Sequence, residues 1–187
     1  MTKKELRKQA LQQRNSLTAD DCAFLSQKLL EGFKTLDFSN IKSIHVFLPI
    51  VSKREPDTFL MIDWLQENHP EVEIIIPKAD FDSCLMSHYH YAGKEDLEQN
   101  RFDMLEPQNA KIATAVPDMV LVPLLGFDLK GNRAGYGKGF YDRFLHNLTA
   151  QKIGLSFFDA VTEINDVHLN DVRLDKCITP SGIIEFN

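Results

Sequence analysis

Polar and apolar residues recur with helical spacing over the first third of the chain. Thr2 with Glu5, and Thr18 with Asp21, match the capping box, in which an acidic side chain three residues on bonds back to the residue before a helix. Two helices are therefore predicted before any strand. Later helical patterns cover residues 56–67, with a proline near the first turn, and residues 140–148.

Short β-branched and aliphatic runs between these helices predict strands. Almost continuously apolar runs, typical of strands buried on both faces, cover 43–50, 72–77 and 119–123, and Pro49 is expected to end the first. Residues 84–91 alternate apolar and polar, which indicates an edge or antiparallel strand. Further strands are predicted at 152–157 and 175–180. The first two buried strands flank a helix as a β-α-β unit, so the pattern predicts a layered α/β fold with a mixed sheet.

The chain has 187 residues, which suits one domain over 1–187. No repeat or linker divides it. The polar segment 93–111 is the longest candidate loop, and loops of this length in compact domains are usually lids or mobile segments.

Charge and cysteine content exclude several classes of protein. Lys and Arg total 21 against 27 Asp and Glu, so the net charge is −6, which argues against broad binding to nucleic acid or anionic membranes. No apolar run approaches the length of about 20 residues that a membrane span needs. Three widely spaced cysteines without a CxxC pair support neither a disulfide framework nor a zinc site. We expect a cytoplasmic monomer.

One segment, 122–145, carries a cluster of glycines between a predicted buried strand and a helix. Four of the nine glycines in the chain lie here, Gly131, Gly135, Gly137 and Gly139. Glycines permit positive φ and close backbone approach, so backbone amides and a helix N-terminus could surround a phosphate there. The segment matches neither a P-loop nor GxGxxG, because Lys138 is followed by glycine instead of Ser or Thr. Spacing alone leaves open a flexible turn with solvated Arg and Lys.

Residues 131–143, preceded by 122–128, resemble the signature of the 5-formyltetrahydrofolate cyclo-ligase family. The resemblance extends over nearly the whole chain, through the basic segment 3–7, the segments 47–49 and 55–58, and the acidic turn 169–175. Two positions depart from the family pattern: Ala134 replaces a usual leucine, and Phe102 lies where a tryptophan is frequent. The resemblance implies a three-layer α/β/α fold with a mostly parallel, mixed central sheet, of the NagB/RpiA/CoA transferase-like type.

The resemblance also implies a reaction. Enzymes of this family convert 5-formyltetrahydrofolate and ATP, with Mg²⁺, into 5,10-methenyltetrahydrofolate, ADP and phosphate. Such a phosphoryl transfer needs positioning, a metal and cationic neutralisation more than a side-chain nucleophile. The absence of a Ser-His-Asp or Cys-His pattern is therefore compatible with it.

Site residues follow from the same resemblance. Arg133 and Lys138 are the expected catalytic cations, and Asp142 and Asp171 the expected Mg²⁺ ligands. The expected ATP-binding residues are Lys3, Lys4, Glu5, Leu6, Arg7, Arg133, Ala134, Gly135, Tyr136, Gly137, Lys138, Gly139, Phe140 and Tyr141. The expected folate-binding residues are Leu48, Glu55, Phe102 and Tyr141, with Phe47 as a further candidate ring wall.

Each of these residues has a plainer explanation. Lys3 and Arg7 could form a solvated basic helix face. Glu55 or Asp57 could cap a helix, Asp142 could be a helix cap or a surface charge, and Asp171 could form an Asx turn. The aromatic and aliphatic residues could simply belong to the core. The six histidines lack a third ligand at suitable spacing for a metal site.

Two other functions remain possible at this stage. One is a sugar-phosphate isomerase or CoA-transferase relative, which would share the layered fold and an anion-binding loop. The other is a module that holds nucleotide or folate without turnover. Consumption of ATP separates both from a cyclo-ligase.

Overall fold

Two capping boxes begin the first helices of the computed structural model, which describes residues 1–186. Helix α1 spans Lys3–Ser16 and α2 spans Ala19–Phe33. The Thr2 and Thr18 hydroxyls accept the backbone N–H of Glu5 and Asp21, and each of these acids bonds back to the threonine. Both helix starts were predicted and are confirmed, since a capping box is a local interaction that the sequence shows directly.

The core of the fold is a seven-stranded sheet in the order β11-β10-β9-β6-β1-β2-β3. Its strands are β1 Ser43–His45, β2 Glu73–Asp80, β3 Leu85–His90, β6 Met119–Pro123, β9 Gln151–Leu155, β10 Lys176–Thr179 and β11 Gly182–Glu185. The five central strands pair in parallel, while β3 and β11 are antiparallel edge strands. Helix α3, Phe59–Asn68, connects β1 to β2 as the predicted β-α-β unit.

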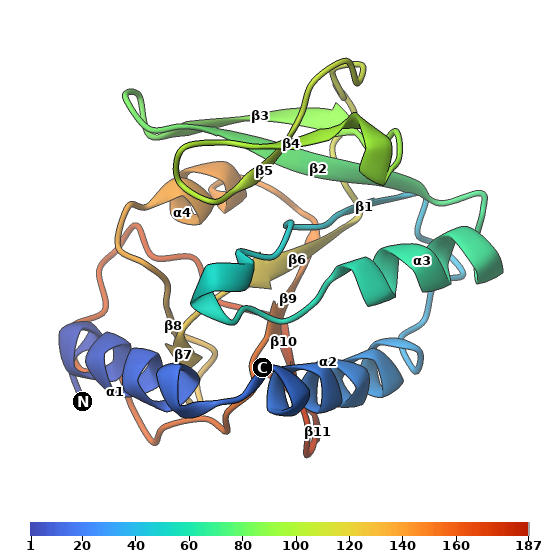
Figure 1. The fold of residues 1–187 in the computed structure, drawn as a ribbon. Helices are drawn as coiled ribbons and strands as arrows, with labels where there is room; N and C mark the ends of the chain where they lie inside the picture. Colours follow the sequence, from blue (N-terminus) through green and yellow to red (C-terminus); the bar gives the residue numbers. More distant parts are fainter. Residues whose placement is uncertain (187) are drawn as a thin grey trace.

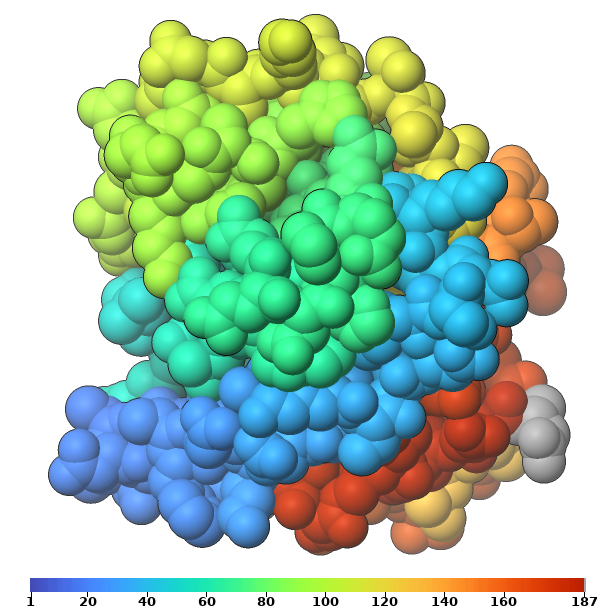
Figure 2. Space-filling model, turned by 90° about the vertical axis from the view of Figure 1, so that its right-hand side faces the viewer, coloured from blue at the N-terminus to red at the C-terminus, as the bar shows by residue number. Residues whose placement is uncertain are grey.

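Helices cover both faces of this sheet and make three layers (Figure 1). On one face, Leu121 and Ile153 pack with residues of α2 and α3. On the other, Val120 and Val122 pack with Leu145 of the short helix α4, Phe140–Leu145. The predicted three-layer α/β/α architecture is confirmed. Figure 2 shows the α3 side, where the blue N-terminal helices lie next to the red C-terminal strands.

Several predicted boundaries are wrong. The strand expected over 43–50 pairs only as Ser43–His45; residues 46–50 stay buried but leave the sheet, so Pro49 does not end it. The helix expected over 140–148 ends at Leu145, and β11 was not predicted. An apolar run in the sequence indicates that a segment is buried, but it does not indicate whether the backbone of that segment pairs with a neighbouring strand.

The segment 93–111 is not a structureless loop, as had been expected. It contains a 3₁₀ turn, Lys94–Asp96, and a small hairpin of β4, Leu97–Gln99, with β5, Leu105–Pro107. The Asp96 carboxylate accepts the backbone N–H groups of Asn109 and Ala110, which closes the segment at its base. Within residues 1–186, no helix is long and apolar enough to cross a membrane.

Candidate active site

The strand order places a topological switch point between β1 and β6. From β1 the chain continues to β2 on one side, whereas β6 and β9 follow on the other side. At such a switch point the loops after the two strands diverge, and ligands of open α/β sheets bind between them. The loops concerned are 46–58, which carries Glu55, and 124–139, which carries the glycine-rich segment.

A small hairpin supports the glycine-rich segment. Strand β7, Gly126–Phe127, pairs with β8, Arg133–Ala134. The buried Asp128 carboxylate holds the turn between them, because it accepts the backbone N–H groups of Lys130, Asn132 and Ile164 at 2.9 Å each. Asp128 was not among the predicted site residues, and its contacts give it a structural role.

The glycines that follow adopt conformations that other residues avoid. Gly137 and Gly139 have φ of 92° and 73°, as predicted for a loop that turns sharply before a helix. The helix itself has only six residues. So short a helix has a small dipole, and the expected contribution of its N-terminus to phosphate binding stays a prediction.

Helix α1 brings a stripe of basic residues to this loop. Lys3, Arg7 and Arg14 lie at i, i+4 and i+11, and so on one side of the helix. The Arg7 Nε donates to the Gly135 carbonyl at 2.7 Å. Lys3 is only 7% exposed, and its ammonium group pairs with the Asp171 carboxylate. The first helix, the glycine loop and the turn at residue 171 therefore meet, although they are far apart in sequence.

A second ion pair lies next to the first. Arg133 Nη2 donates to Asp142 Oδ1 at 2.7 Å, and the Val172 N–H donates to the same oxygen at 3.2 Å. Burial lowers the pKa of Arg133, an effect that the carboxylates of Asp142 and Asp171 oppose. The two expected metal ligands thus both lie within electrostatic reach of the same guanidinium.

The pKa of Asp171 is lowered in the folded protein. Partial burial alone would raise it, but hydrogen bonds from the Lys3 ammonium and the His168 N–H outweigh that effect. The carboxylate is therefore held in its charged form, which is the form that a metal ion binds.

The two carboxylates fit Mg²⁺ only in part. Carboxylate oxygens suit this ion, which commonly takes one or two from the protein and its other ligands from phosphates and water. Within residues 1–186 there is no group of three His, Cys, Asp or Glu residues that could hold a metal. Each carboxylate also has a cationic partner, Arg133 or Lys3. The set therefore fits a magnesium ion that arrives with phosphate oxygens, not one caged by protein.

Glu55 lies buried on the other side of the loop. Its Oε2 accepts the Ile50 N–H at 2.9 Å, and its Oε1 accepts the Tyr136 hydroxyl at 2.7 Å. Glu55 therefore does not cap α3, because Thr58 is the residue before that helix. The structure joins Tyr136, expected at ATP, to Glu55, expected at folate. Sequence reasoning missed Arg14, which also contacts the Tyr136 hydroxyl.

The expected ring-binding residues lie in different surroundings. Leu48 and Phe47 are buried in the main core. Phe102 is 41% exposed and packs on Phe81, with ring centroids 4.3 Å apart, and Phe81 in turn contacts Phe140 at the start of α4. Phe81 was not predicted, since it lies on a hairpin turn far from both partners in sequence.

Tyr141 is a partly buried residue whose polar end is enclosed. Its hydroxyl is buried and has no hydrogen-bond partner within the described part of the chain. Burial raises its pKa, and the Glu55 charge raises it further. The hydroxyl is therefore protonated and lies within electrostatic reach of Glu55.

Other expected ATP-binding residues have contacts of their own. Glu5 bonds to Thr2 in the capping box, and Leu6 and Ala134 pack together in a small core cluster. Lys4 and Lys138 are exposed, and Lys138 forms no ion pair within residues 1–186. Lys4 likewise forms no ion pair in this part of the chain, so neither lysine is held by a carboxylate.

Two histidines lie beneath the site on the α4 face of the sheet. His45 of β1 is fully buried, and its ring lies 4.7 Å from Phe144 and 5.2 Å from His88. The His88 ring stacks on Phe144. Burial lowers the pKa of both histidines, and the neighbouring His88 adds to the effect at His45. They form an uncharged layer under α4.

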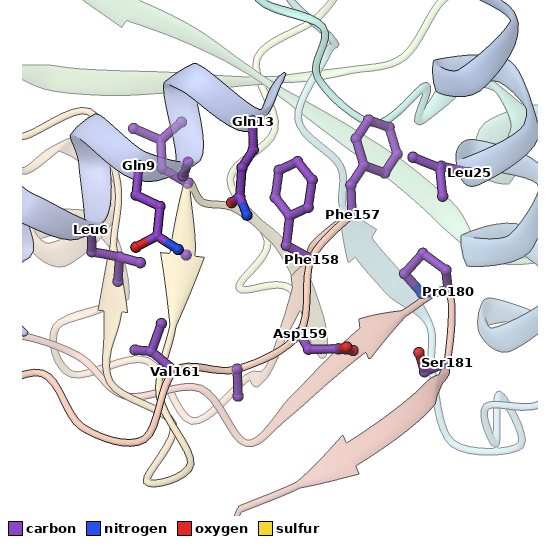
Figure 3. Close-up of a pocket in the computed structure, with 14 residues that line it drawn as sticks. Leu6, Gln9, Gln13, Leu25, Phe157, Phe158, Asp159, Val161, Pro180 and Ser181 are labelled. Atoms are coloured by element: carbon purple, nitrogen blue, oxygen red, sulfur yellow. The ribbon is translucent and has the colours of Figure 1, made fainter. Parts of the chain in front are cut away.

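A separate cavity of about 410 Å³ lies along the neighbouring face of α1 (Figure 3). Gln9 and Gln13 from the helix and Phe158 and Asp159 from the loop after β9 line it. None of its lining residues within the described chain is Lys or Arg. The cavity therefore does not suit a phosphate, in contrast to the glycine-rich loop.

Comparison with known proteins agrees with this geometry. The model of the 5-formyltetrahydrofolate cyclo-ligase family matches residues 1–180. The chain is 33% identical over 165 residues to 5-formyltetrahydrofolate cyclo-ligase of Mycoplasma pneumoniae, covering 84% of this chain and 86% of that one. It is 25% identical over 173 residues to the mitochondrial 5-formyltetrahydrofolate cyclo-ligase of Arabidopsis thaliana, covering 79% of this chain and 62% of the relative.

Solved structures give the same result for the fold. The NMR structure of Aquifex aeolicus 5,10-methenyltetrahydrofolate synthetase superposes with a TM-score of 0.83 at 28% identity. The superposition covers 100% of this chain and 94% of that one. Strand order and helix layers are therefore shared over the whole described chain.

Proposed function

The chain belongs to the 5-formyltetrahydrofolate cyclo-ligase family, and we propose that it converts 5-formyltetrahydrofolate and ATP into 5,10-methenyltetrahydrofolate, ADP and phosphate at this site. One observation carries the proposal: basic residues of α1, the glycine-rich loop and two carboxylates meet at the switch point, next to the buried Glu55. The site therefore has a charged end, which suits the nucleotide, and a buried carboxylate, Glu55, which suits the pterin ring of the folate.

The charged end favours a polyphosphate. Lys3, Arg7, Arg133 and Lys138 supply four positive charges, and Asp142 and Asp171 supply two negative ones, so the local excess is +2 in a chain whose net charge is −6. Charge-assisted bonds from Arg and Lys to phosphate oxygens are among the strong polar contacts. ATP is thus held at this end, and its γ-phosphate lies toward the loop.

At the other end, Glu55 orients the folate. The guanidine-like edge of a pterin presents two N–H donors, and a carboxylate can accept both. Because Glu55 is 7% exposed, few water molecules compete for these bonds. The ring is thereby fixed relative to the loop, so that the formyl oxygen faces the γ-phosphate.

The reaction proceeds in two displacements. The formyl oxygen bonds to the γ-phosphorus, and the bond from that phosphorus to the bridging oxygen of ADP breaks. N10 of the folate then attacks the formyl carbon, loses its proton, and phosphate leaves with the former formyl oxygen. Arg133 and Lys138 neutralise charge on the transferred group, which is the main contribution that a protein makes to phosphoryl transfer.

Magnesium belongs to this proposal as a companion of ATP. Asp142 and Asp171 would hold it, and when bound it would neutralise phosphate charge. Lys3 and Arg133 would then share these carboxylates with the metal or turn to phosphate oxygens, which are equally suitable partners for a cation. Such an exchange of partners would couple binding of the metal to binding of the nucleotide.

The direct test is formation of methenyltetrahydrofolate, followed by its absorbance, with ATP and Mg²⁺ omitted one at a time. We expect product only when 5-formyltetrahydrofolate, ATP and the metal are all present, with one ADP formed per product. Equal rates without nucleotide would overturn the proposal. ADP formation also separates a ligase from the isomerase, CoA-transferase and passive-binding alternatives.

We also propose that the enzyme works in the cytoplasm as a monomer. Its three cysteines, Cys22, Cys84 and Cys177, are free thiols, as expected in a reducing compartment. Light scattering after size-exclusion chromatography tests the monomer.

A further inference from the structure

Arg14, in the last turn of α1, is a buried cation that has no direct anionic partner among residues 1–186. It is 2% exposed, and it is one of the largest fully buried side chains of the protein. Its Nη2 donates to the Leu124 carbonyl at 2.6 Å, and its Nη1 donates to the Tyr136 hydroxyl at 3.2 Å. A buried guanidinium is costly unless nearby groups compensate its charge. Its position therefore requires an explanation.

The compensating charge is Glu55, reached through one hydroxyl group. Tyr136 accepts a hydrogen bond from Arg14 and donates one to Glu55 at 2.7 Å. Burial raises the pKa of Tyr136, as does the Glu55 charge, while Arg14 opposes them, so the phenol keeps its proton and remains a donor. The arrangement is a chain from guanidinium through hydroxyl to carboxylate.

This chain fixes the carboxylate without using all its acceptor positions. A carboxylate has about four acceptor positions. The Ile50 N–H takes one on Oε2, and the Tyr136 hydroxyl takes one on Oε1. One position on each oxygen stays available, so two parallel donors can bind while both anchoring bonds remain in place.

Arg14 also joins the segments around the site. Its side chain contacts the turn after β6 at Leu124 and the glycine loop at Tyr136, and its carbonyl accepts a bond from Arg54, the residue before Glu55. A change at this one side chain therefore acts directly on the 124–139 loop, and it reaches Glu55 in the 46–58 loop only through the Tyr136 hydroxyl, because Arg54 bonds to the backbone of Arg14.

We propose that Arg14 is a positioning residue for the folate substrate, which acts through the Tyr136 hydroxyl to hold the Glu55 carboxylate in its binding orientation. The proposal rests on the proposed function, because it assigns Glu55 to the pterin. Arg14 touches neither substrate, and its effect falls on folate affinity instead of nucleotide affinity.

A double-mutant cycle tests this. Arg14→Met and Tyr136→Phe should each raise the KM for 5-formyltetrahydrofolate about tenfold, and the KM for ATP by less than about twofold. The double variant should be no worse than Arg14→Met alone, because both changes break the same chain. Arg14→Lys, which keeps the charge, should recover part of the loss, and it replaces Arg14→Met in the cycle if that variant does not fold.

Tyr91→Phe is the matched control, because it removes a hydroxyl beyond the end of β3, in the surroundings of Asp63 and Glu95. Neither KM should change more than about twofold. If the single-variant losses multiply, or if both KM values rise equally, Arg14 has only a structural role and the inference is overturned. If the unmodified protein makes no product, both the inference and the proposed function are overturned. Calorimetry of 5-formyltetrahydrofolate binding should reproduce the same non-additivity without turnover.

Discussion

Two groups of charged residues border the glycine-rich loop, and their charges meet in different ways. In the first, Lys3–Asp171 and Arg133–Asp142, the cation and the anion touch directly. In the second, Arg14 and Glu55 are separated by the Tyr136 hydroxyl. The first group keeps some contact with water at its carboxylates, which are 18% and 29% exposed, whereas Arg14 and Glu55 are buried.

This difference suits the two substrates. A direct ion pair at a partly exposed site can exchange partners with little reorganisation, since an arriving metal and phosphate offer each member a new opposite charge. A chain that runs through a fixed hydroxyl cannot exchange in this way, and holds its carboxylate still. Ion pairs that can exchange partners suit the binding of a charged nucleotide. A carboxylate held in one orientation suits the binding of a flat ring, which is recognised by the positions of its hydrogen-bond donors.

Arg133→Met should produce the largest effect, because it removes a cation from the first group, in which cations and carboxylates are in direct contact (the exchangeable group). We expect kcat to fall about 100-fold to 1,000-fold, the cost typical of losing a donor that stabilises transition-state charge. Steady-state kinetics measure this. Lys130→Met is the matched control, since the Lys130–Glu163 pair is exposed, and its kcat should change less than twofold. A loss below about fivefold for Arg133→Met would place this residue outside the reaction.

Glu55→Gln tests the second group, in which Glu55 is held through the Tyr136 hydroxyl (the fixed group), and it should have the next largest effect. The neutral amide keeps only one acceptor oxygen, so it cannot accept two parallel N–H donors with one bond on each oxygen. The Kd for 5-formyltetrahydrofolate should rise at least about tenfold, while that for ATP stays within about threefold. Isothermal titration calorimetry measures both. Equal losses for the two ligands would indicate a folding role for Glu55 and remove the distinction between the groups.

Lys3→Met sharpens the comparison at the exchangeable group. The Kd for ATP should rise about tenfold, as expected for one lost charge-assisted contact. Without nucleotide, Mg²⁺ should bind more tightly than to the unmodified protein, because Asp171 no longer has a cationic partner. Magnesium titrations of Lys3→Met and of Asp171→Asn, by calorimetry, should move in opposite directions. Identical titrations for both variants and the unmodified protein would contradict the exchange.

The smallest effect concerns the histidine layer that lies under both groups. His45 and His88 have pKa values below those of the unfolded chain, so below pH 6.5 the unfolded state binds more protons and stability falls as pH falls. Each histidine should contribute to the loss of stability between pH 7.5 and 5.5. Urea unfolding should show a smaller loss over this range for His88→Phe than for the unmodified protein, whereas the exposed His146→Gln should not differ from it. An unchanged pH dependence in His88→Phe would contradict this.

Features that depend on residues close together in the sequence were predicted correctly, and features that depend on distant residues were not. Both helix starts were predicted, because Thr2 and Thr18 find their capping partners three residues away. The end of β1 was not, because residues 46–50 remain apolar while they turn away from the sheet toward Glu55. The predicted burial of these residues is confirmed, and their predicted place in the strand is wrong.

The same distinction applies to the site. The glycine-rich segment and its cations are contiguous, so the family pattern reveals them. Arg14 was missed, because a basic residue in the last turn of a helix ordinarily complements the helix dipole at the surface. Its burial depends on Leu124 and Tyr136, which lie 110 and 122 positions further on. No local pattern contains that information.

The Lys3–Asp171 pair joins residues that are 168 positions apart, with consequences for synthesis of the chain. At roughly 5 to 20 residues per second, about 8 to 34 seconds separate the addition of these two residues during translation. Throughout that interval the basic stripe of α1 exists without the carboxylate that completes its surroundings. A nascent chain, or a product truncated before residue 171, therefore carries Lys3 without its carboxylate partner and lacks one of the two carboxylates of the candidate site.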